Sequence, residues 1–438
     1  MRKRAYGTVA VNRVDVERLA QGREGQPACV GFDVGKYELV GVLRWSADDF
    51  ERPWRVANPS QIAQAVDVLR RLGQGRALQI AMESSGTYGD ALRQALHDAD
   101  LPLRRVSAKA AHDYAEVFDG VPSQHDGKDA AVIAELLALG KAQPWSYAPP
   151  SEWEEELAYW VDEIEAQRRI ASLWLGRVEG LLARHWPEVT PRLLRVSSGT
   201  LLRVLTVYGG PAELAADPKA AERLTAWGGS FLGPEKVAQL LACARDTAGV
   251  RLGPIGRRRL QQTAQRARDA RRLVRQGQWQ LRRLAKGHAI LQAQGQAVGV
   301  PTACVLWASL GDPRDYHCGN AYRKAMGLNL GEFSSGTYEG PLRISKRGSA
   351  RVRQWLYFAA LRCVQQAGLR GWYEAKKARD GAEALRALVA IMRKLALAMY
   401  RVSVDQEPFD VAKLFPGKPG PGRSQRPLPD AVPANGRT

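Results

Sequence analysis

Four acidic residues stand where their carboxylates could share a metal ion. Asp33 lies in a short apolar segment, and Glu83 ends a second one. Asp126 and Asp129 are three residues apart at the start of a predicted helix, so both can project from one helical face. Divalent Mg²⁺ prefers oxygen ligands, and two such ions can stabilise the attacking and leaving oxygens of a phosphoryl transfer. The pattern therefore indicates metal-assisted phosphoryl chemistry.

Each acid taken alone has a simpler explanation. An aspartate between a strand and a turn is commonly a turn former, and Asp126 could simply cap a helix. Asp33 is the most informative of the four, because a charge between Phe32 and Val34 is costly to bury without a partner. Gathering all four carboxylates is also costly unless a cation is present.

A second group of reactive and basic residues lies near the C-terminus. Ser334 and Ser335 precede a glycine, and Arg343, Lys346 and Arg347 follow. Such a loop could bring a hydroxyl to a phosphodiester while the cations hold its oxygens. From these residues alone, a polar turn beside a solvated basic loop is the simpler interpretation.

The acidic residues fall where strand and helix patterns alternate. Strands are expected over 28–35, 37–43, 77–82 and 103–106, and helices after residue 59, over 88–98 and around 130–137. This alternation predicts an α/β domain over residues 27–147. Residues 1–26 show no clear periodicity and are expected to form a flexible extension.

The rest of the chain has helical patterning. Leu260, Ala267, Val274 and Leu281 are spaced by seven on an Arg-rich helix, with Gly277 as a weak point. This heptad stripe predicts either a coiled-coil arm or an amphipathic helix that packs within one chain. The predicted regions are a helical region with this arm over 148–290, a mainly α C-terminal domain over 291–410, and a disordered basic tail over 411–438.

The charge of the chain indicates a polyanionic partner. Among 438 residues the formal net charge is +19, and 45% of the residues are hydrophobic, enough for a sizeable core. Charge alone does not separate DNA from RNA or from an anionic membrane surface. On the Arg-rich helix, Arg257, Arg258, Arg271 and Arg272 are candidate nucleic-acid contacts, together with the basic residues that follow the two serines.

The five cysteines argue against two classes of small domain. Their number is odd and no CxxC pair occurs, so neither a zinc ribbon nor a disulfide framework is expected. Free thiols fit a reducing cytosol. No apolar run approaches the length of a membrane span, so we expect a cytoplasmic protein without a membrane partner.

Three segments that carry the acidic residues resemble the motifs of the DEDD insertion-sequence transposases. They are residues 31–36, 82–88 and 125–130, and their order and spacing match the family. The resemblance implies a RuvC-like, ribonuclease-H-type N-terminal domain. It also implies that Asp33, Glu83, Asp126 and Asp129 bind Mg²⁺ or Mn²⁺. Many relatives carry Lys-Thr before the first aspartate of the last pair, whereas Gln124 and His125 stand there in this chain.

Residues 298–363 and 385–400 are similar to the C-terminal domain of the same family. The resemblance implies that a serine just before a glycine is the nucleophile, which makes Ser335 the first choice and Ser334 the fallback. It implies a DNA transposase or recombinase that forms a phosphoserine intermediate. The further implied partners are donor and target DNA, a structured bridge RNA that guides the enzyme, and other copies of the chain in dimers and tetramers. The implied location is the nucleoid of a prokaryotic cytoplasm.

Two other functions remain open at this stage. A RuvC-like, metal-dependent, structure-specific endonuclease would need the four carboxylates but not Ser335. A non-catalytic nucleic-acid-binding protein derived from a transposase would need neither. The presence of all four acids and of both serines argues against the second alternative.

Overall fold

The computed structural model describes residues 7–84, 86–120, 125–145, 147–332, 334–335, 338–340, 342–381 and 383–415. The chain divides into two compact units, Met1–Pro149 and Pro150–Thr438. In the described residues, no helix is both long and apolar enough to cross a membrane.

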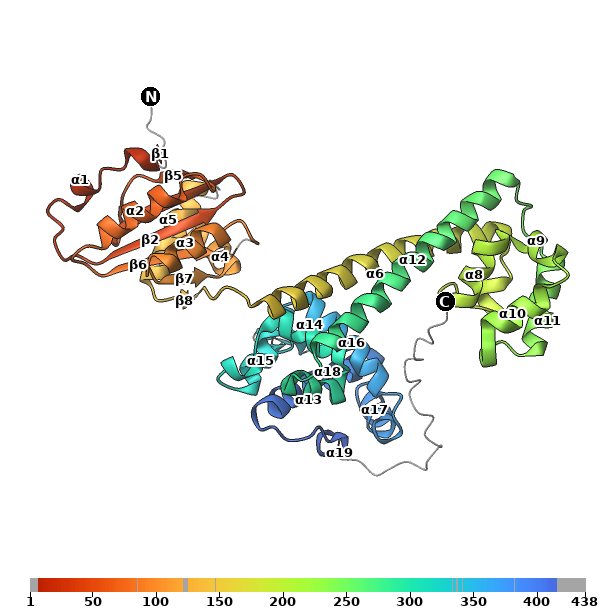
Figure 1. Cartoon of the computed structure of the whole chain (residues 1–438). Coiled ribbons are helices and arrows are strands. Elements are labelled where there is room, and N and C mark those ends of the chain that lie inside the picture. The colour runs from red at the N-terminus through yellow and green to blue at the C-terminus, as the bar shows by residue number, and fades with distance from the viewer. Residues whose placement is uncertain are drawn as a thin grey trace. The chain divides into compact units, whose positions relative to one another are not determined.

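Unit 1 is built on a mixed β-sheet with the strand order β1-β5-β3-β2-β6-β7-β8, and β4 pairs with β3 (Figure 1). The strands are β1 (Val9–Ala10), β2 (Ala28–Val34), β3 (Glu38–Ser46), β4 (Asp49–Phe50), β5 (Trp54–Ala57), β6 (Leu78–Glu83), β7 (Leu103–Val106) and β8 (Gln143–Pro144). Strand β3 is antiparallel to β2 and β5, whereas β6 is parallel to both β2 and β7. This arrangement confirms the predicted RuvC-like, ribonuclease-H-type fold.

Helices cover both faces of this sheet. They are the 3₁₀ turn η1 (Val11–Arg13) and the helices α1 (Val16–Ala20), α2 (Ile62–Gly73), α3 (Asp90–Asp98), α4 (Ala108–Asp119) and α5 (Asp126–Ala138). Side chains of α2 and α3 pack with Val30 and Phe32 in one core cluster. Side chains of α4 and α5 pack on the other face, against Ala81 and Val106. Because successive residues of a strand point to opposite faces, each face collects alternate positions of β2 and β6.

The prediction of a flexible extension over 1–26 is wrong for the residues that the structure describes. Strand β1 pairs in parallel with β5, and Val11 and Val16 are buried in the core of unit 1. The strand has two residues and helix α1 has five, which is too short for a periodic pattern to be visible. Their order comes from packing against the sheet, and residues 1–6 lie outside the described part.

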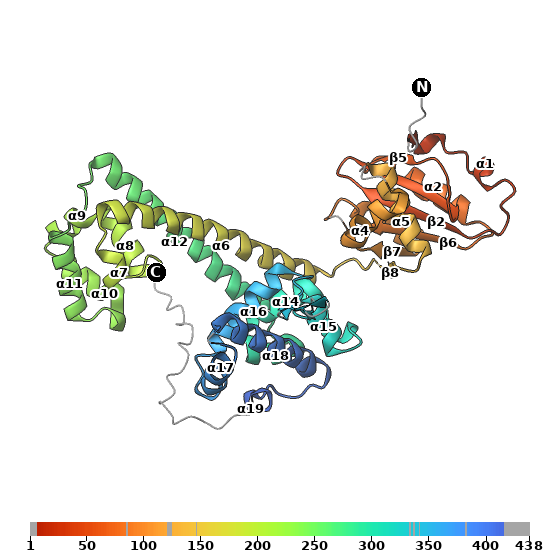
Figure 2. The ribbon, with the colours of Figure 1, turned by 180° about the vertical axis from the view of Figure 1, so that it is seen from behind.

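Unit 2 contains two long antiparallel helices that form an arm, α6 (Glu152–His185) and α12 (Pro254–Leu284). They lie side by side in both Figure 1 and Figure 2. Trp153 at the start of α6 donates from Nε1 to the Leu284 carbonyl at the end of α12, at 3.0 Å. The heptad residues Leu260, Ala267 and Leu281 are buried within this unit, so the stripe packs within one chain.

Gly277 was expected to weaken the arm, and the structure assigns it a different role. A Cβ atom at this position would lie 2.6 Å from Cγ1 of Ile164 on α6. A side chain at residue 277 would therefore push the two helices apart. The glycine allows their close approach.

The far end of the arm carries a helical head, residues 189–245. Its elements are α7 (Val189–Arg192), α8 (Gly199–Tyr208), α9 (Pro211–Ala216), α10 (Ala220–Gly228), the 3₁₀ turn η2 (Gly229–Phe231) and α11 (Pro234–Arg245). Leucines of α8, α10 and α11 share a buried cluster with Leu182 of α6 and Leu260 of α12. The head is therefore packed firmly onto the arm.

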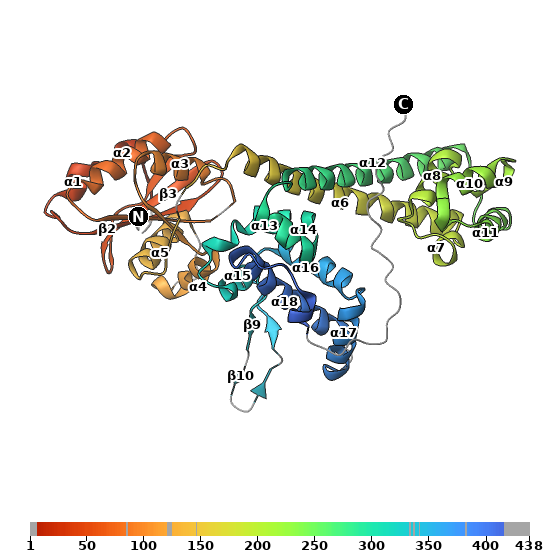
Figure 3. The same cartoon turned by 60° about the horizontal axis from the view of Figure 1, so that its bottom comes forward.

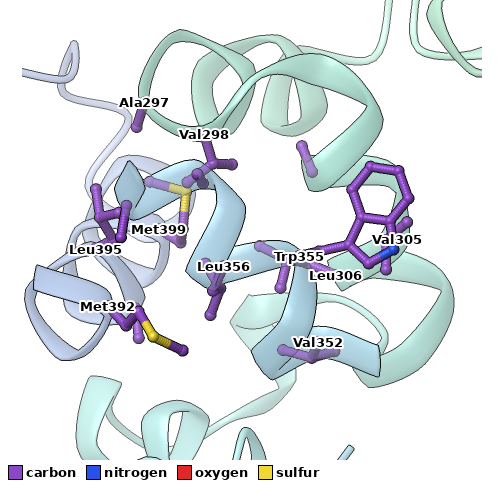
Figure 4. Packing of buried hydrophobic residues seen from close by; sticks show 14 of the residues in the cluster. Ala297, Val298, Val305, Leu306, Val352, Trp355, Leu356, Met392, Leu395 and Met399 are labelled. Atoms are coloured by element: carbon purple, nitrogen blue, oxygen red, sulfur yellow. The ribbon is translucent and has the colours of Figure 1, made fainter. Parts of the chain in front are cut away.

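The C-terminal part of unit 2 is mainly helical, as predicted. Its elements are α13 (Ala289–Val298), α14 (Val300–Leu310), η3 (Pro313–Asp315), α15 (Gly319–Ala325), β9 (Leu330–Gly331), β10 (Ser334–Ser335), β11 (Tyr338–Glu339), β12 (Arg343–Ile344), α16 (Ala350–Cys363), α17 (Ala367–Arg379), α18 (Ala384–Val404) and α19 (Val411–Leu414). Figure 4 shows its core, where Leu356 of α16 and Leu395 and Met399 of α18 interdigitate. The same cluster includes Leu157 and Leu281 of the arm, so the predicted regions 148–290 and 291–410 belong to one compact unit.

The prediction of a disordered tail from residue 411 is wrong at its start. Helix α19 occupies Val411–Leu414, and Phe415 is buried with its ring 5.0 Å from that of Trp372. An aromatic anchor decides this local order, which the polar composition of the tail concealed. Residues 416–438 lie outside the described part.

Candidate active site

Asp33 and Glu83 lie on neighbouring strands and on the same face of the sheet. Strands β2 and β6 are parallel with Phe32 opposite Met82, which makes Asp33 and Glu83 the next positions along the two strands. Phe32 and Met82 both belong to the core cluster on the other face. The alternation of side chains therefore places both carboxylates on the face that α4 and α5 cover.

Gly31 allows helix α5 to approach this face. A Cβ atom on Gly31 would lie 2.3 Å from the carbonyl oxygen of Ala130 and 2.4 Å from the nitrogen of Ala134. Only a glycine permits backbone-to-backbone contact of this kind. Arg44 of β3 also forms a largely buried ion pair with Glu135 of α5. These contacts fix the start of α5 close to Asp33.

The first turn of α5 carries the other two acids, Asp126 and Asp129. His125 is the N-cap residue, and its Nδ1 accepts a hydrogen bond from the Lys128 backbone at 3.1 Å. Asp126 is exposed and Asp129 is half-buried. His125 therefore serves the start of the helix.

Burial and neighbouring negative charge raise the pKa of three of the four carboxylates. Burial, followed by the charges of Asp129, Asp126 and Glu83, raises the pKa of Asp33 to about 6. Burial and Asp129 raise the pKa of Glu83, and burial and Asp126 raise that of Asp129. The four acids singled out in the sequence therefore lie near enough for their charges to interact, and we call them the acidic group.

The chemistry of the acidic group fits a divalent cation. Each carboxylate disfavours ionisation of a neighbour, and a cation between them would remove that repulsion. In the described part of the chain, however, no three His, Cys, Asp or Glu side chains lie close enough together to hold a metal ion as they stand.

Lys128 is a residue of this site that sequence reasoning missed. Its side chain is only 1% exposed, and its Nζ lies 2.6 Å from an Asp119 carboxylate oxygen. The ion pair joins the end of α4 to the start of α5. In the sequence, a lysine beside two aspartates is typical of a solvated helix surface. Only the packing of α4, a helix that we did not predict, shows that Lys128 is buried.

The two candidate serines lie on a β-hairpin that extends from the helices of unit 2 (Figure 3). Strands β9 and β12 pair first, with Gly331 opposite Arg343, and β10 and β11 pair further out. In the outer ladder Ser335 stands opposite Tyr338. Ser334 and Ser335 are both exposed, and adjacent residues of a strand point to opposite faces. A substrate on one face would therefore meet only one of the two hydroxyls.

The base of this hairpin is held tightly. Gly348 has a φ of 156°, and a Cβ atom there would lie 2.2 Å from the Ala325 carbonyl oxygen. Arg353 donates to the Gly348 carbonyl at 2.8 Å. Lys346 and Arg347 lie in this held segment and are exposed, as is Arg343 on β12. The three basic residues predicted around the serines therefore remain accessible to an anion.

The candidate arginines of α12 have different surroundings. Arg257 forms an ion pair with Glu213 at 2.6 Å, whereas Arg258 is exposed. Arg271 and Arg272 line a cavity between α12 and the helical head. The sequence marked these four arginines alike, although only the last two share a concave surface.

Two family models match separate segments of the chain. A DEDD-type IS110 model, described as "Transposase", matches residues 30–187, a segment that contains the whole acidic group. A second model, "Transposase IS116/IS110/IS902 family", matches residues 288–375, which contain Ser334 and Ser335. No match was found among curated proteins.

One matching solved structure is titled "Thermus thermophilus RuvC structure". Its sequence is 16% identical to this chain, and the TM-score is 0.20. The match covers 27% of this chain and 99% of the RuvC chain. The two family matches together span more than half of the sequence. The chain belongs to the DEDD-type IS110 transposase family and is a transposase.

Proposed function

We propose that this transposase cuts and rejoins DNA through a covalent phosphoserine intermediate. Ser335 is the proposed nucleophile, with Ser334 as the fallback. The acidic group is the proposed ligand set for Mg²⁺ or Mn²⁺. The observation that carries the proposal is the placement of Asp33, Glu83 and the first turn of α5 on one face of the sheet, secured by the contact of α5 with Gly31.

The proposed reaction conserves the energy of the phosphodiester bond. The Ser335 hydroxyl oxygen attacks the phosphorus of a DNA phosphodiester, and the serine proton leaves. The phosphorus–O3′ bond breaks, and the departing 3′ oxygen takes up a proton. In the reverse sense, the 3′ hydroxyl of another strand attacks the phosphoserine, which restores the serine and joins the strands without ATP.

The protein must activate a weak nucleophile and stabilise a charged phosphate. The bound ion would supply positive charge to the phosphate oxygens. Arg343, Lys346 and Arg347 would hold the same DNA backbone by charge-assisted hydrogen bonds. The acidic group and the serine belong to different units, so this proposal requires both units for one reaction.

The remaining partners are also part of the proposal. We propose that a structured bridge RNA pairs with donor and target DNA, so that base pairing supplies sequence specificity while the protein contacts backbone and shape. The net charge of +19 supports several nucleic-acid contacts. We further propose that the enzyme works as a dimer or tetramer. The heptad stripe does not itself argue for this, because its residues pack within the chain.

A denaturing gel tests the covalent step. Labelled substrate DNA, Mg²⁺ and RNA transcribed from the DNA beside the gene are incubated with the full chain. Wild type should give a protein–DNA adduct that protease removes, and Ser335→Ala should give none. Asp33→Asn should lower adduct formation by at least about a thousandfold, because one ligand of the proposed ion is lost.

Ser334→Ala is the matched control, because it is the adjacent exposed serine on the same strand. Adduct retained by Ser335→Ala but lost by Ser334→Ala would move the nucleophile to Ser334. If both variants still recombine DNA, the phosphoserine step is wrong. Cleavage that depends on Asp33 without any adduct would then favour a metal-dependent endonuclease.

A further inference from the structure

A cavity of about 530 Å³ lies between the helical head and α12. Its walls come from the start of α8, the turn from α10 into η2, and the middle of α12. A volume of this size is within the range of small-molecule and cofactor sites. The cavity lies wholly within unit 2 and contains no residue of the proposed catalytic chemistry.

Five arginines line this cavity, one from α8 and four from α12: Arg203, Arg268, Arg271, Arg272 and Arg275. In the described residues, none of the five forms an ion pair, whereas Arg257 and Arg283 of the same helix each do. Asp269 is the one acidic residue among the described residues that line the cavity. Its carboxylate accepts a hydrogen bond from Gln265 at 3.0 Å. The positive charge of the cavity is therefore largely uncompensated.

Crowding of the arginines is visible at Arg271. Burial, followed by the charge of Arg275, lowers the pKa of its guanidinium. Arg271 also donates to the Ser197 carbonyl, which holds it at the wall of the cavity. Like charges kept together in this way favour an anion between them. Arginine is well suited to phosphate, because its planar group donates two parallel hydrogen bonds.

Aromatic rings lie beside the arginines. The Arg203 guanidinium stacks over the Trp227 ring at 4.8 Å, and Phe231 at the edge of the cavity is 86% exposed. The exposed ring of Phe231 is free to be covered by a flat partner, which would remove its apolar surface from water. Flat rings next to phosphate-binding cations are the combination that proteins use for unpaired nucleotides.

We propose that this cavity binds an unpaired nucleotide of a nucleic-acid strand. The arginines of α12 hold its phosphodiester, and its base stacks on Phe231. This site depends on the transposase having a nucleic-acid partner, but not on the phosphoserine chemistry or the metal. Binding can therefore be measured without cleavage, and either proposal can fail without the other.

Fluorescence anisotropy with the full chain tests the charge half of the proposal. The probes are labelled 20-nucleotide single strands of RNA and DNA, in EDTA and at several salt concentrations. The Arg272→Gln/Arg275→Gln variant removes two exposed arginines and should weaken binding about tenfold or more. The slope of log affinity against log salt should fall by about 1.4, because about 0.7 is lost for each single-strand phosphate contact.

The matched control is Arg259→Gln/Arg282→Gln. These two arginines are also exposed on α12 and lie outside the cavity, so the variant loses the same charge from the same helix. The control variant should weaken binding no more than about threefold, because charges outside the cavity act on the strand mainly through the screened overall field. Equal weakening by the two variants would overturn the proposal. Circular dichroism melting of each variant checks that the fold is retained.

A strand that carries no bases tests the stacking half of the proposal. Phe231→Ala should weaken binding of the intact strand about fivefold to tenfold, since stacking on an aromatic ring has roughly this value. The same variant should not change binding of a strand made entirely of abasic sugar phosphates. An equal effect on both strands would overturn a base-stacking role. Competition by AMP or inorganic phosphate at concentrations near the Kd of the strand would show that the cavity takes a free anion instead.

Discussion

The acidic group of unit 1 and the arginine cavity of unit 2 are alike in one respect and opposite in another. Each gathers like charges at a partly buried place. Each also has a residue of opposite charge beside it, and that residue already has another partner. Lys128 pairs with Asp119 outside the acidic group, and Asp269 accepts a hydrogen bond from Gln265. In both regions neighbouring side chains of like charge repel one another, and a ligand of opposite charge would relieve this repulsion.

The two regions differ in how they are constructed. The acidic group depends on strand register and on a backbone contact between β2 and α5 that tolerates no side chain. The arginine cavity is formed by long side chains on helix surfaces, which can adjust to a ligand. If both proposals hold, the first region would bind a small ion in a fixed place, and the second would accept a larger, flexible anion.

Gly31→Ala should have the largest effect and tests the rigid side of this comparison. The new Cβ would meet backbone atoms of α5 at 2.3 Å and 2.4 Å, which neither helix nor strand can avoid without moving. We expect the free energy of unfolding to fall by about 3 kcal/mol or more. Urea unfolding followed by circular dichroism measures this change.

Gly73→Ala is the control for that variant. Gly73 ends helix α2, and a Cβ there meets Leu78 at an ordinary 3.7 Å. Its free energy of unfolding should stay the same or rise by about 0.5 kcal/mol. Comparable losses in the two variants would mean that the contact between β2 and α5 is not a special constraint.

The pH dependence of metal-free protein should be the next largest effect. Folding raises the pKa of Asp33 from 3.8 to about 6, so the folded state holds this proton more tightly than the unfolded chain. The resulting stability is fully present below about pH 4 and is lost as the pH rises through about 6. The free energy of unfolding of Asp33→Asn, measured relative to that of wild type, should therefore rise by up to about 3 kcal/mol between pH 4 and pH 7.5.

Urea unfolding in EDTA at the two pH values measures this difference, and it separates Asp33 from other titrating groups because both proteins share them. Added Mg²⁺ at pH 7.5 should stabilise wild type and have less effect on Asp33→Asn, since a bound ligand stabilises the folded state. Parallel pH profiles of wild type and variant would contradict the picture of repelling carboxylates.

Asp269→Asn should have the smallest effect and tests the arginine cavity from the opposite direction. Removing its negative charge leaves the neighbouring arginines with no acidic neighbour among the described residues that line the cavity. Binding of a single strand should tighten about twofold to fivefold in the same anisotropy assay. Asp246→Asn makes the same change of charge on exposed surface outside the cavity. An equal gain in both variants would show that only net charge matters.

Much of the acidic group could be predicted from the sequence, because short motifs carry it. The strands that contain Asp33 and Glu83 are apolar and regular, and the spacing of Asp126 and Asp129 indicates one helical face. The pair of serines and the basic residues around them are also local features of the sequence. The predictions that were wrong concern residues 7–26 and Phe415, where local order depends on packing against distant parts of the chain.

The sequence by itself identified the candidate residues: the acidic motifs, the adjacent serines and the excess of arginine are all fixed by residue type and spacing. Tertiary structure decided how these residues are used. It buried Lys128, made Gly31 and Gly277 points of close approach, and separated Arg271 from Arg257 along one Arg-rich helix. The physical reason is that burial and charge compensation depend on neighbours far away in the chain, which no local pattern records.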